Sequence, residues 1–244
     1  TNGVLLAQHA QALRDAGLQR LTVSLDTLDP ATFRLLARRD DLARTLEGLA
    51  AAKAAGFSAI KLDTVVIGGV NDAELPALLE FARREAVEIR FIEYMDVGGA
   101  TQWRPERVVS RAQMLARLER HFGPIRPLPR ENSAPAEQLE LDDGTRFGII
   151  SSMTQPFCSS CDRARLTADG MWFTCLYALH GHDLGALLRR GVDDAQLAAR
   201  IRALWSERAD AGAEERKAGA GRGPLAAVDR LRADPHLEMH TRGG

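Results

Sequence analysis

The first half of the sequence alternates between short apolar runs and longer segments with helical spacing. The runs Arg20–Leu25, Ala59–Ile67 and Glu88–Met95 are predicted strands, because they are rich in β-branched and apolar residues. Helical segments separate these strands, so each strand can return in the same direction as the one before. A strand–helix–strand repeat of this kind predicts a parallel sheet, open or barrel-like, covered by helices.

The helices between these strands carry start and stop signals. Asp29 is an expected N-cap residue, and Pro30 after it suits the first helical position. The following Ala- and Leu-rich helix should end at Gly56, a typical residue just beyond a helix C-terminus. Asn71 and Asp72 are alternative N-caps for the next helix. These signals support the alternation of strands and helices.

The pattern changes near residue 125, where a proline-rich stretch begins. Two β-hairpins are predicted after it, with turns at Asp143-Gly144 and Asp169-Gly170. We expect two further helices, which run from about Leu184 to Arg190 and from Asp194 to Glu207. The second half is therefore predicted to be a smaller α+β region built on antiparallel hairpins.

This change of pattern divides the chain into two expected regions. Residues 1–125 would form the parallel α/β region, and residues 126–244 the antiparallel one. Within the second region, the Ala- and Gly-rich segment 209–223 is predicted to be a flexible linker. The chain ends in a Gly-Gly tail.

The composition excludes several classes of protein. Hydrophobic residues make up 45% and charged residues 27% of the chain, which is ordinary for a globular protein. A net charge of −1 argues against a general binder of nucleic acid or membrane surfaces. No apolar run approaches the ~20 residues of a membrane span, and no signal peptide is visible. Three cysteines, an odd number, argue against a disulfide framework and suit the cytoplasm.

All three cysteines lie in one short stretch of the predicted second region. Cys158 and Cys161 form a C-x-x-C pair in a loop, and Cys175 ends a hairpin strand that should fold back towards them. Three converging thiols would suit a [4Fe–4S] cluster with one open iron. They would also suit zinc, with His180 or His182 as the fourth ligand. A redox pair is disfavoured, because the motif precedes a hairpin instead of opening a helix. The spacing alone does not choose between cluster and zinc.

Four basic residues are candidate functional residues. Arg163 and Arg165 alternate on the strand that leaves the cysteines, so both should point to one face. Guanidinium groups bind phosphate strongly, although the two could instead neutralise a metal site. Lys61 and Arg90 lie in largely apolar strands, where a charge is costly without a partner. The alternative for this pair is a side chain that snorkels from a strand end to solvent.

At this point the sequence resembles GTP 3′,8-cyclase, the molybdenum cofactor biosynthesis protein A family of radical S-adenosylmethionine enzymes. The resemblance covers nearly the whole chain and is carried most specifically by the Cys-x2-Cys-x13-Cys run followed by R-L-T-x-D-G. The other matching stretches are TNG at the start, DAGLQRLTVSLDTLDP, IKLDTVVIGGVND, EIRFIEYMDVGG, TQPF before the first cysteine, and the terminal GG. The implied fold is a partial parallel β/α barrel of the radical-SAM type, followed by the smaller hairpin region.

The resemblance also implies a set of site residues. In this family the C-terminal three-cysteine site holds a [4Fe–4S] cluster, and the guanine of GTP approaches its free iron. The implied cluster ligands are Cys158, Cys161 and Cys175. The implied triphosphate-binding residues are Lys61, Arg90, Arg163 and Arg165. The implied S-adenosylmethionine contacts are Ser24 and Met95.

The implied reaction converts GTP to (8S)-3′,8-cyclo-7,8-dihydroguanosine 5′-triphosphate by radical chemistry, on the route to molybdopterin. The resemblance further implies a cytoplasmic protein and a homodimer as a candidate assembly. Cyclic pyranopterin monophosphate synthase would act downstream. No nucleic-acid or membrane partner is expected.

The family carries a second, N-terminal [4Fe–4S] cluster on Cys-x3-Cys-x2-Cys, which cleaves S-adenosylmethionine to a 5′-deoxyadenosyl radical. That motif does not occur in this sequence. We therefore expect a fragment that retains the GTP-side cluster and is inactive alone. Smaller departures are Asp63, where the family usually has Asn, and Arg242, where Ile commonly precedes the Gly-Gly. Two alternatives stay open: a non-catalytic zinc-binding structural module, and a different radical enzyme with an auxiliary cluster for peptide modification.

Overall fold

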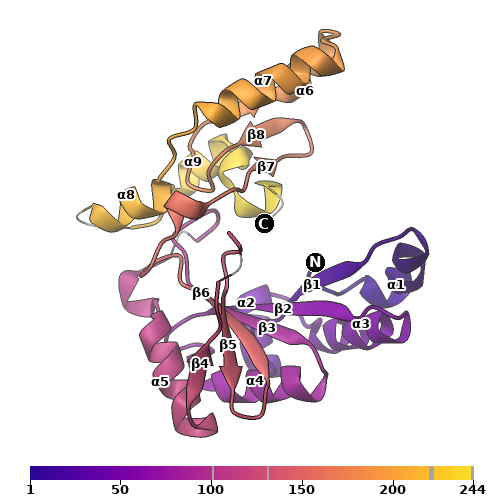
Figure 1. Cartoon of the computed structure of the whole chain (residues 1–244), viewed down its shortest axis with the longest axis vertical. Helices are drawn as coiled ribbons and strands as arrows, with labels where there is room; N and C mark the ends of the chain where they lie inside the picture. Colours follow the sequence, from indigo (N-terminus) through magenta and orange to yellow (C-terminus); the bar gives the residue numbers. More distant parts are fainter. Residues whose placement is uncertain (101, 131, 220–222, 243–244) are drawn as a thin grey trace. The chain divides into compact units, whose positions relative to one another are not determined.

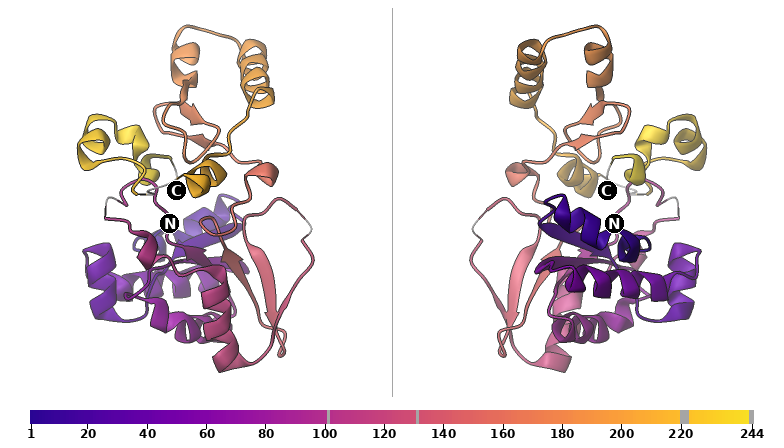
Figure 2. Two further views of the ribbon diagram at one scale, coloured as in Figure 1. Left: turned by 90° about the vertical axis from the view of Figure 1, so that its left-hand side faces the viewer. Right: turned by 90° about the vertical axis from the view of Figure 1, so that its right-hand side faces the viewer.

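The structure is a computed structural model of the chain. It describes residues 1–100, 102–130, 132–219 and 223–242. The chain forms two compact units, each built from two segments (Figures 1 and 2). The first unit comprises Thr1–Tyr94 and Glu106–Ser151, and the second comprises Met95–Pro105 and Ser152–Gly244. None of the helices in the described ranges has both the length and the apolar character needed to cross a membrane.

The first unit is built on a six-stranded sheet with the strand order β1-β2-β3-β6-β5-β4. The strands are β1 (Arg20–Ser24), β2 (Ala59–Val66), β3 (Glu88–Glu93), β4 (Ile125–Pro127), β5 (Glu137–Leu141) and β6 (Arg146–Ile150). Pairing is parallel from β1 through β2 and β3 to β6, and antiparallel from β6 through β5 to β4. The predicted parallel α/β arrangement is therefore confirmed, whereas its barrel type stays a prediction.

Local sequence signals predict the start of α2 and the end of α3. The helices of this unit are α1 (Leu6–Asp15), α2 (Pro30–Ala37), α3 (Leu42–Ala54), α4 (Leu75–Arg84) and α5 (Arg111–Phe122), with the 3₁₀ turns η1 (Asp72–Glu74) and η2 (Pro105–Arg107). The Asp29 side chain accepts a hydrogen bond from the Thr32 N–H at 2.7 Å, as expected of an N-cap. Gly56, just beyond α3, has a φ of +84°, which favours glycine.

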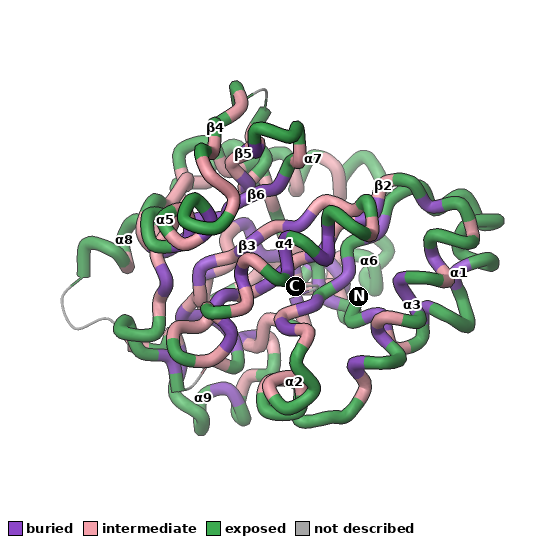
Figure 3. Tube along the Cα trace, turned by 90° about the horizontal axis from the view of Figure 1, so that it is seen from below, coloured by how far each residue is buried: buried purple, intermediate pink, exposed green. Residues whose placement is uncertain are grey.

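The two faces of the sheet differ sharply in character. Buried and half-buried residues alternate along β2 and β3 (Figure 3). The buried face includes Leu62 and Phe91, which are fully inaccessible and belong to one core with the helix residues Leu49 and Leu78. The other, half-buried face carries the charged residues Lys61, Asp63, Glu88 and Arg90. This alternation places the candidate site residues of the first unit on the face that the core does not use.

The β5–β6 hairpin belongs to the first unit, which differs from the boundary expected near residue 125. Its turn at Asp143-Gly144 is as predicted, with a φ of +83° at Gly144. However, β6 pairs in parallel with β3, and Ile89 lies opposite Phe147. Turn residues reveal which neighbouring strands pair, but they do not reveal the distant strand that a hairpin joins.

The second unit contains a three-stranded antiparallel sheet in the order β7-β8-β9. Its strands are β7 (Arg165–Leu166), β8 (Met171–Phe173) and β9 (His182–Asp183). Its helices are α6 (Leu184–Arg189), α7 (Asp194–Ser206), α8 (Gly212–Ala218) and α9 (Val228–Ala233), with the 3₁₀ turns η3 (Cys158–Ser160), η4 (Pro235–Leu237) and η5 (Met239–Arg242). The predicted turn at Asp169-Gly170 is confirmed, with a φ of +94° at Gly170.

One segment of the second unit corrects the sequence prediction. Residues 212–218 form the helix α8, within the segment 209–223 that was predicted to be a flexible linker. The Ala- and Gly-rich composition did not indicate that two charged side chains of this segment make specific contacts. Arg216 pairs with Asp96, and Lys217 donates to the Thr154 carbonyl at 2.6 Å. Residues 220–222 of the predicted linker and the Gly-Gly tail lie outside the described residues.

Candidate functional site

Two groups of side chains contain the predicted site residues, one in each unit. In the first unit, Lys61 and Arg90 share one partner on the less buried face of the sheet. The Lys61 Nζ lies 3.4 Å and the Arg90 Nε 3.0 Å from the Oε1 of Glu88. Burial opposes ionisation of Glu88, but the hydrogen bond from Arg90 and the charge of Lys61 hold its pKa below the ordinary value. Glu88 therefore offsets the cost of two cations in the sheet.

Two carboxyl groups extend this polar face towards the carboxyl ends of the strands. Asp63 lies opposite Arg90 in the β2–β3 register, and its buried Oδ1 accepts no hydrogen bond from any residue that the structure describes. Burial raises the pKa of Asp63, although Arg90 and Lys61 oppose the shift. Asp26 accepts a hydrogen bond from the Val65 N–H at 2.8 Å, and burial, aided by the Asp63 charge, raises its pKa to about 6. Sequence reasoning noted Asp63 only as a departure and missed Asp26.

The predicted S-adenosylmethionine contacts fall in different units. Ser24 is the exposed last residue of β1, and its N–H donates to the Thr1 carbonyl at 2.9 Å. Met95 is half-buried and is the first residue of the second unit, shortly after β3 ends at Glu93. Each residue thus stands at or just beyond the carboxyl end of a parallel strand, where α/β proteins form their sites.

The three cysteines are all reduced and half-buried in the second unit. Cys158 opens the η3 turn, and the Cys161 N–H closes that turn on the Cys158 carbonyl at 3.1 Å. In the part of the chain that the structure describes, no three cysteine, histidine, aspartate or glutamate side chains gather closely enough to hold a metal ion. The expected convergence of the thiols, with or without His180 or His182, is therefore not seen. The strand β7 starts only at Arg165, so hairpin pairing does not position the loop before it.

Burial and hydrogen bonding act in opposite directions on two of the thiols, with different outcomes. Burial opposes ionisation of Cys161, but the Arg163 N–H and the guanidinium groups of Arg208 and Arg163 hold its pKa below the ordinary value. The Arg163 Nη2 lies 3.6 Å from the Cys161 Sγ. At Cys175, burial is the larger effect and raises the pKa, while the backbone N–H of Tyr177 donates to the sulfur at 3.4 Å. Hydrogen bonds of this kind are typical of sulfur ligands in metal sites.

The charges of two of the cysteines act on the guanidinium of Arg165. Burial and the neighbouring charge of Arg163 lower the pKa of its guanidinium, and the charges of Cys161 and Cys175 oppose that shift. The structure therefore brings both predicted arginines into the surroundings of the cysteines. The surroundings of the free thiols thus include backbone N–H and guanidinium groups.

Arg242 is anchored on the same hairpin. Its guanidinium carbon lies 3.9 Å from the centre of the Phe173 ring, and its Nη1 donates to the Leu176 carbonyl at 2.9 Å. The residue is almost fully buried, and burial lowers the pKa of its guanidinium. In place of the Ile common in the family, this chain therefore has a cation that packs on an aromatic ring. Only the departure itself was visible in the sequence.

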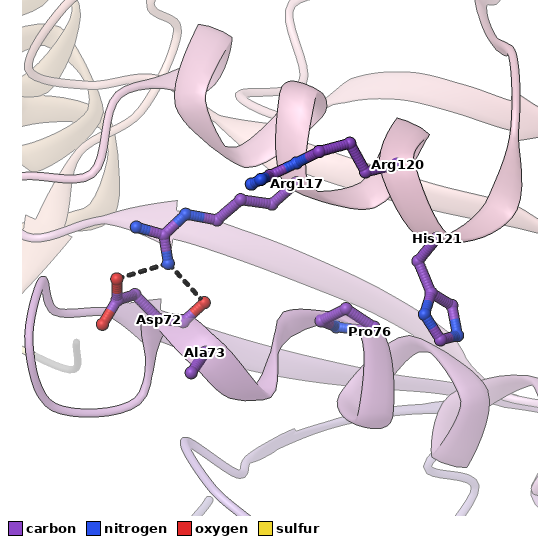
Figure 4. Close-up of a pocket in the computed structure, with 6 residues that line it drawn as sticks. All are labelled: Asp72, Ala73, Pro76, Arg117, Arg120 and His121. Carbon is purple, nitrogen blue, oxygen red and sulfur yellow. Dashed lines mark hydrogen bonds and ion pairs between the residues drawn. The ribbon is translucent and has the colours of Figure 1, made fainter.

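A separate cavity in the first unit contains none of the predicted site residues (Figure 4). It is lined by Asp72, Ala73, Pro76, Arg117, Arg120 and His121. Arg117 pairs with Asp72, as the dashed lines in Figure 4 show, and the His121 Nε2 lies 2.9 Å from a Glu80 oxygen. These basic side chains are thus bound to neighbouring acidic groups.

Comparisons with known proteins agree with the resemblance. Residues 1–82 match the Radical SAM superfamily, and residues 87–213 match the family described as Molybdenum Cofactor Synthesis C. GTP 3′,8-cyclase 3 of Mycobacterium bovis is 53% identical over the whole chain, which covers 65% of that protein. GTP 3′,8-cyclase 1 of Mycobacterium tuberculosis is 51% identical over the whole chain, which covers 68% of that protein.

A relative from another genus shows a similar level of identity. GTP 3′,8-cyclase of Acidothermus cellulolyticus is 50% identical over 86% of this chain and 60% of its own length. The chain thus spans about two thirds of the length of the mycobacterial relatives. With both family matches and half of all positions identical along its whole length, the chain belongs to the GTP 3′,8-cyclase family of radical S-adenosylmethionine proteins.

Proposed function

We propose that this chain is the GTP-side part of a GTP 3′,8-cyclase, which binds the substrate triphosphate beside a [4Fe–4S] cluster. The observation that carries the proposal is the position of the two arginines among the thiols. The Arg163 Nη2 lies 3.6 Å from the Cys161 sulfur. The charges of Cys161 and Cys175 favour the charged form of Arg165. Guanidinium groups beside thiolate ligands can hold the phosphates of a nucleotide whose base approaches the metal.

The cluster ligands would be Cys158, Cys161 and Cys175. A [4Fe–4S] cluster binds each thiolate through a different iron, so its ligand sulfurs do not have to surround one ion. The free thiols and the N–H and guanidinium groups around them support this assignment. When bound, the cluster would supply an open iron for the guanine of GTP.

Lys61 and Arg90 are the proposed phosphate-binding residues of the first unit. Both contact Glu88, so a phosphate group would compete with that carboxylate for them. Charge-assisted hydrogen bonds contribute about 1.5–3 kcal/mol each. Because the contacts are ionic, we expect GTP affinity to fall as the salt concentration rises.

Ser24 and Met95 are the proposed S-adenosylmethionine contacts. Their positions at the carboxyl ends of β1 and β3 support this assignment. All three cysteines of the chain are assigned to the GTP-side cluster, which leaves no thiol for a second one. We therefore propose that the chain alone does not cleave S-adenosylmethionine.

Anaerobic reconstitution of the whole chain tests the cluster. We expect iron and acid-labile sulfide in equal amounts, and GTP binding that depends on the loaded cluster. A variant with all three cysteines changed to alanine should take up neither. Stoichiometric zinc without sulfide would instead support the structural zinc module.

The proposal on S-adenosylmethionine has its own assay. The reconstituted chain is incubated with dithionite and S-adenosylmethionine, and 5′-deoxyadenosine is measured against a protein-free control. We expect no release above that control. Release above it would show that this chain generates the radical by itself.

A further inference from the structure

The helix α8 packs directly against the third cysteine. A Cβ built on Gly212, the first residue of α8, would lie 3.2 Å from the Cys175 Sγ and 2.6 Å from the Tyr177 Cβ. Real Cβ atoms essentially never approach another atom within 3.0 Å, and the Tyr177 Cβ is close to the main chain and cannot swing away. Only glycine therefore lets the α8 backbone lie this close to Cys175.

The backbone on both sides of the Cys175 sulfur limits its exposure. The Tyr177 N–H donates to this sulfur at 3.4 Å, and the α8 backbone at Gly212 lies against it. Backbone groups around a ligand sulfur disperse its negative charge and limit the access of solvent. Gly212 thus affects the exposure of one proposed cluster ligand.

The other end of α8 is fixed by a buried ion pair. The Nε and Nη2 of Arg216 lie 2.8 Å and 2.7 Å from the Oδ2 of Asp96, whose side chain is completely buried. The Tyr177 hydroxyl donates to the Asp96 Oδ1 at 2.9 Å. Since Tyr177 also contacts Gly212, its ring and hydroxyl connect both ends of α8. The helix is therefore held in one position relative to Cys175.

We propose that Gly212 is a positioning residue of the three-cysteine site, through which α8 packs against the Cys175 sulfur and covers it. The inference rests on the proposed function only where it concerns the bound cluster. For the metal-free chain it concerns the thiol alone. The two parts can therefore be tested separately.

The first test uses the metal-free whole chain. Each cysteine is alkylated with iodoacetamide, and its rate is followed by mass spectrometry of the corresponding peptide. In Gly212→Ala the displaced helix should expose Cys175, whose alkylation should accelerate about threefold or more, because thiol reactivity follows exposure. The rates at Cys158 and Cys161 should change much less.

Gly219→Ala is the matched control, because it places the same substitution at the other end of α8. A Cβ there would meet only the carbonyl oxygens of Arg216 and Glu215 at 3.7 Å, an ordinary contact. Its alkylation rates should equal those of the unmodified chain. If Gly212→Ala does not fold, Arg216→Lys tests the same point, because it loosens the far end of α8 while keeping a charge opposite Asp96.

The second test concerns the reconstituted cluster. Gly212→Ala should change the reduction potential or the electron paramagnetic resonance signal of the cluster, while Gly219→Ala should not. If even the unmodified chain takes up no iron, the proposed function fails and the alkylation result still decides the role of Gly212. An unchanged rate at Cys175 in a folded Gly212→Ala chain, or an equal increase at all three cysteines, would overturn the inference.

Discussion

The Nη2 nitrogen of Arg163 lies 3.6 Å from the sulfur of Cys161, and its guanidinium carbon lies 5.0 Å from the centre of the Phe157 ring. The Arg163 Nε is buried and donates to no partner within the described residues. One guanidinium group therefore faces a proposed metal ligand and retains a donor for something else. This arrangement raises the question whether the arginine stabilises the cluster, holds the substrate, or does both.

Replacement of Arg163 and Arg165 by alanine should separate these roles. If they hold the triphosphate, GTP affinity per intact cluster should fall about tenfold or more, because a charge-assisted contact is lost. Lysine should rescue only in part, since it lacks the bidentate fork. The measurement is GTP titration with iron determined on the same sample. A fall in iron content with unchanged affinity per cluster in the double alanine variant would instead assign both arginines to neutralisation of the cluster.

The buried ion pair of the second unit should contribute strongly to its stability. Arg216→Ala should lower the free energy of unfolding by about 3–5 kcal/mol, because it breaks a pair whose carboxylate, Asp96, is fully buried. Tyr177→Phe removes one hydrogen bond to the same carboxylate and should cost about 1–3 kcal/mol. Urea unfolding measures both values.

The control for this experiment is an exposed ion pair of the same unit. The Arg232 Nη1 lies 3.7 Å from an Asp229 oxygen, and both side chains are largely exposed. Arg232→Ala should therefore change the stability by no more than about 0.5 kcal/mol. An Arg216→Ala chain as stable as Arg232→Ala would contradict the assigned role of the buried pair.

The contact between His236 and Asp169 should make the stability of the second unit depend on pH. The His236 Nε2 lies 2.7 Å from the Asp169 Oδ2. The hydrogen bond that His236 donates to the Asp169 carboxylate raises the pKa of His236 above its ordinary value of 6.5. The Thr167 hydroxyl, followed by His236, lowers the pKa of Asp169 to about 2. Both groups are therefore charged at pH values between the pKa of Asp169 and the pKa of His236.

The direction of each change follows from these shifts. The stabilisation through His236 is complete below pH 6.5 and is lost as the pH rises through the raised pKa of the folded state. The stabilisation through Asp169 is present above pH 3.8 and is lost as the pH falls towards 2. The contribution of this pair to thermal stability should therefore be constant between pH 3.8 and pH 6.5, and His236→Gln should reduce the decline in stability above pH 6.5. A decline of equal size in His236→Gln would assign it to other groups.

Asp26 should make stability depend on pH in the direction opposite to that of Asp169. Burial raises its pKa from 3.8 to about 6, so the folded state keeps a proton that the unfolded chain loses, and stability falls as the pH rises through this interval. Asp26→Asn retains an acceptor for the Val65 N–H and removes the charge. The variant should be more stable at pH 7 by up to about 3 kcal/mol, and the difference should vanish near pH 4.

Asp29→Asn supplies the control with the reverse expectation. The Thr32 N–H lowers the pKa of the exposed Asp29, so the charge stabilises the folded state and its removal should reduce stability at neutral pH. Chemical unfolding at pH 4 and pH 7 compares the two variants. An Asp26→Asn chain that is destabilised equally at both pH values would show that the charge of Asp26 is not the source of the effect.

Local sequence patterns predicted the strands and helices well, because periodicity and turn chemistry act between near neighbours. They could not reveal the pairing of β3 with β6, which depends on residues as distant as Ile89 and Phe147. Asn71 shows a similar limit. It was expected as a helix cap, but its buried side chain accepts from the Ile67 N–H at 2.8 Å and donates to the Asp26 and Val65 carbonyls at 2.7 and 2.8 Å.

The candidate site could be predicted as a set of residues but not as an arrangement. Lys61 and Arg90 stood out as charges in apolar strands, yet their common partner Glu88 follows from the strand register, which the sequence does not show. Gly212 was missed altogether. Its role depends on the close approach of α8 to Cys175, and nothing in a glycine- and alanine-rich stretch indicates such a contact.

The chain passes from the first unit to the second after Tyr94, returns at Glu106, and leaves again after Ser151. Neither unit is therefore a continuous stretch of polypeptide that could be excised or exchanged as a cassette. A fragment that begins at Ser152 would lack Asp96, and Arg216 and Tyr177 would lose their buried carboxylate. In laboratory recombination among relatives, residues 95–105 should accordingly be exchanged together with the C-terminal half, although they lie within the N-terminal half of the sequence.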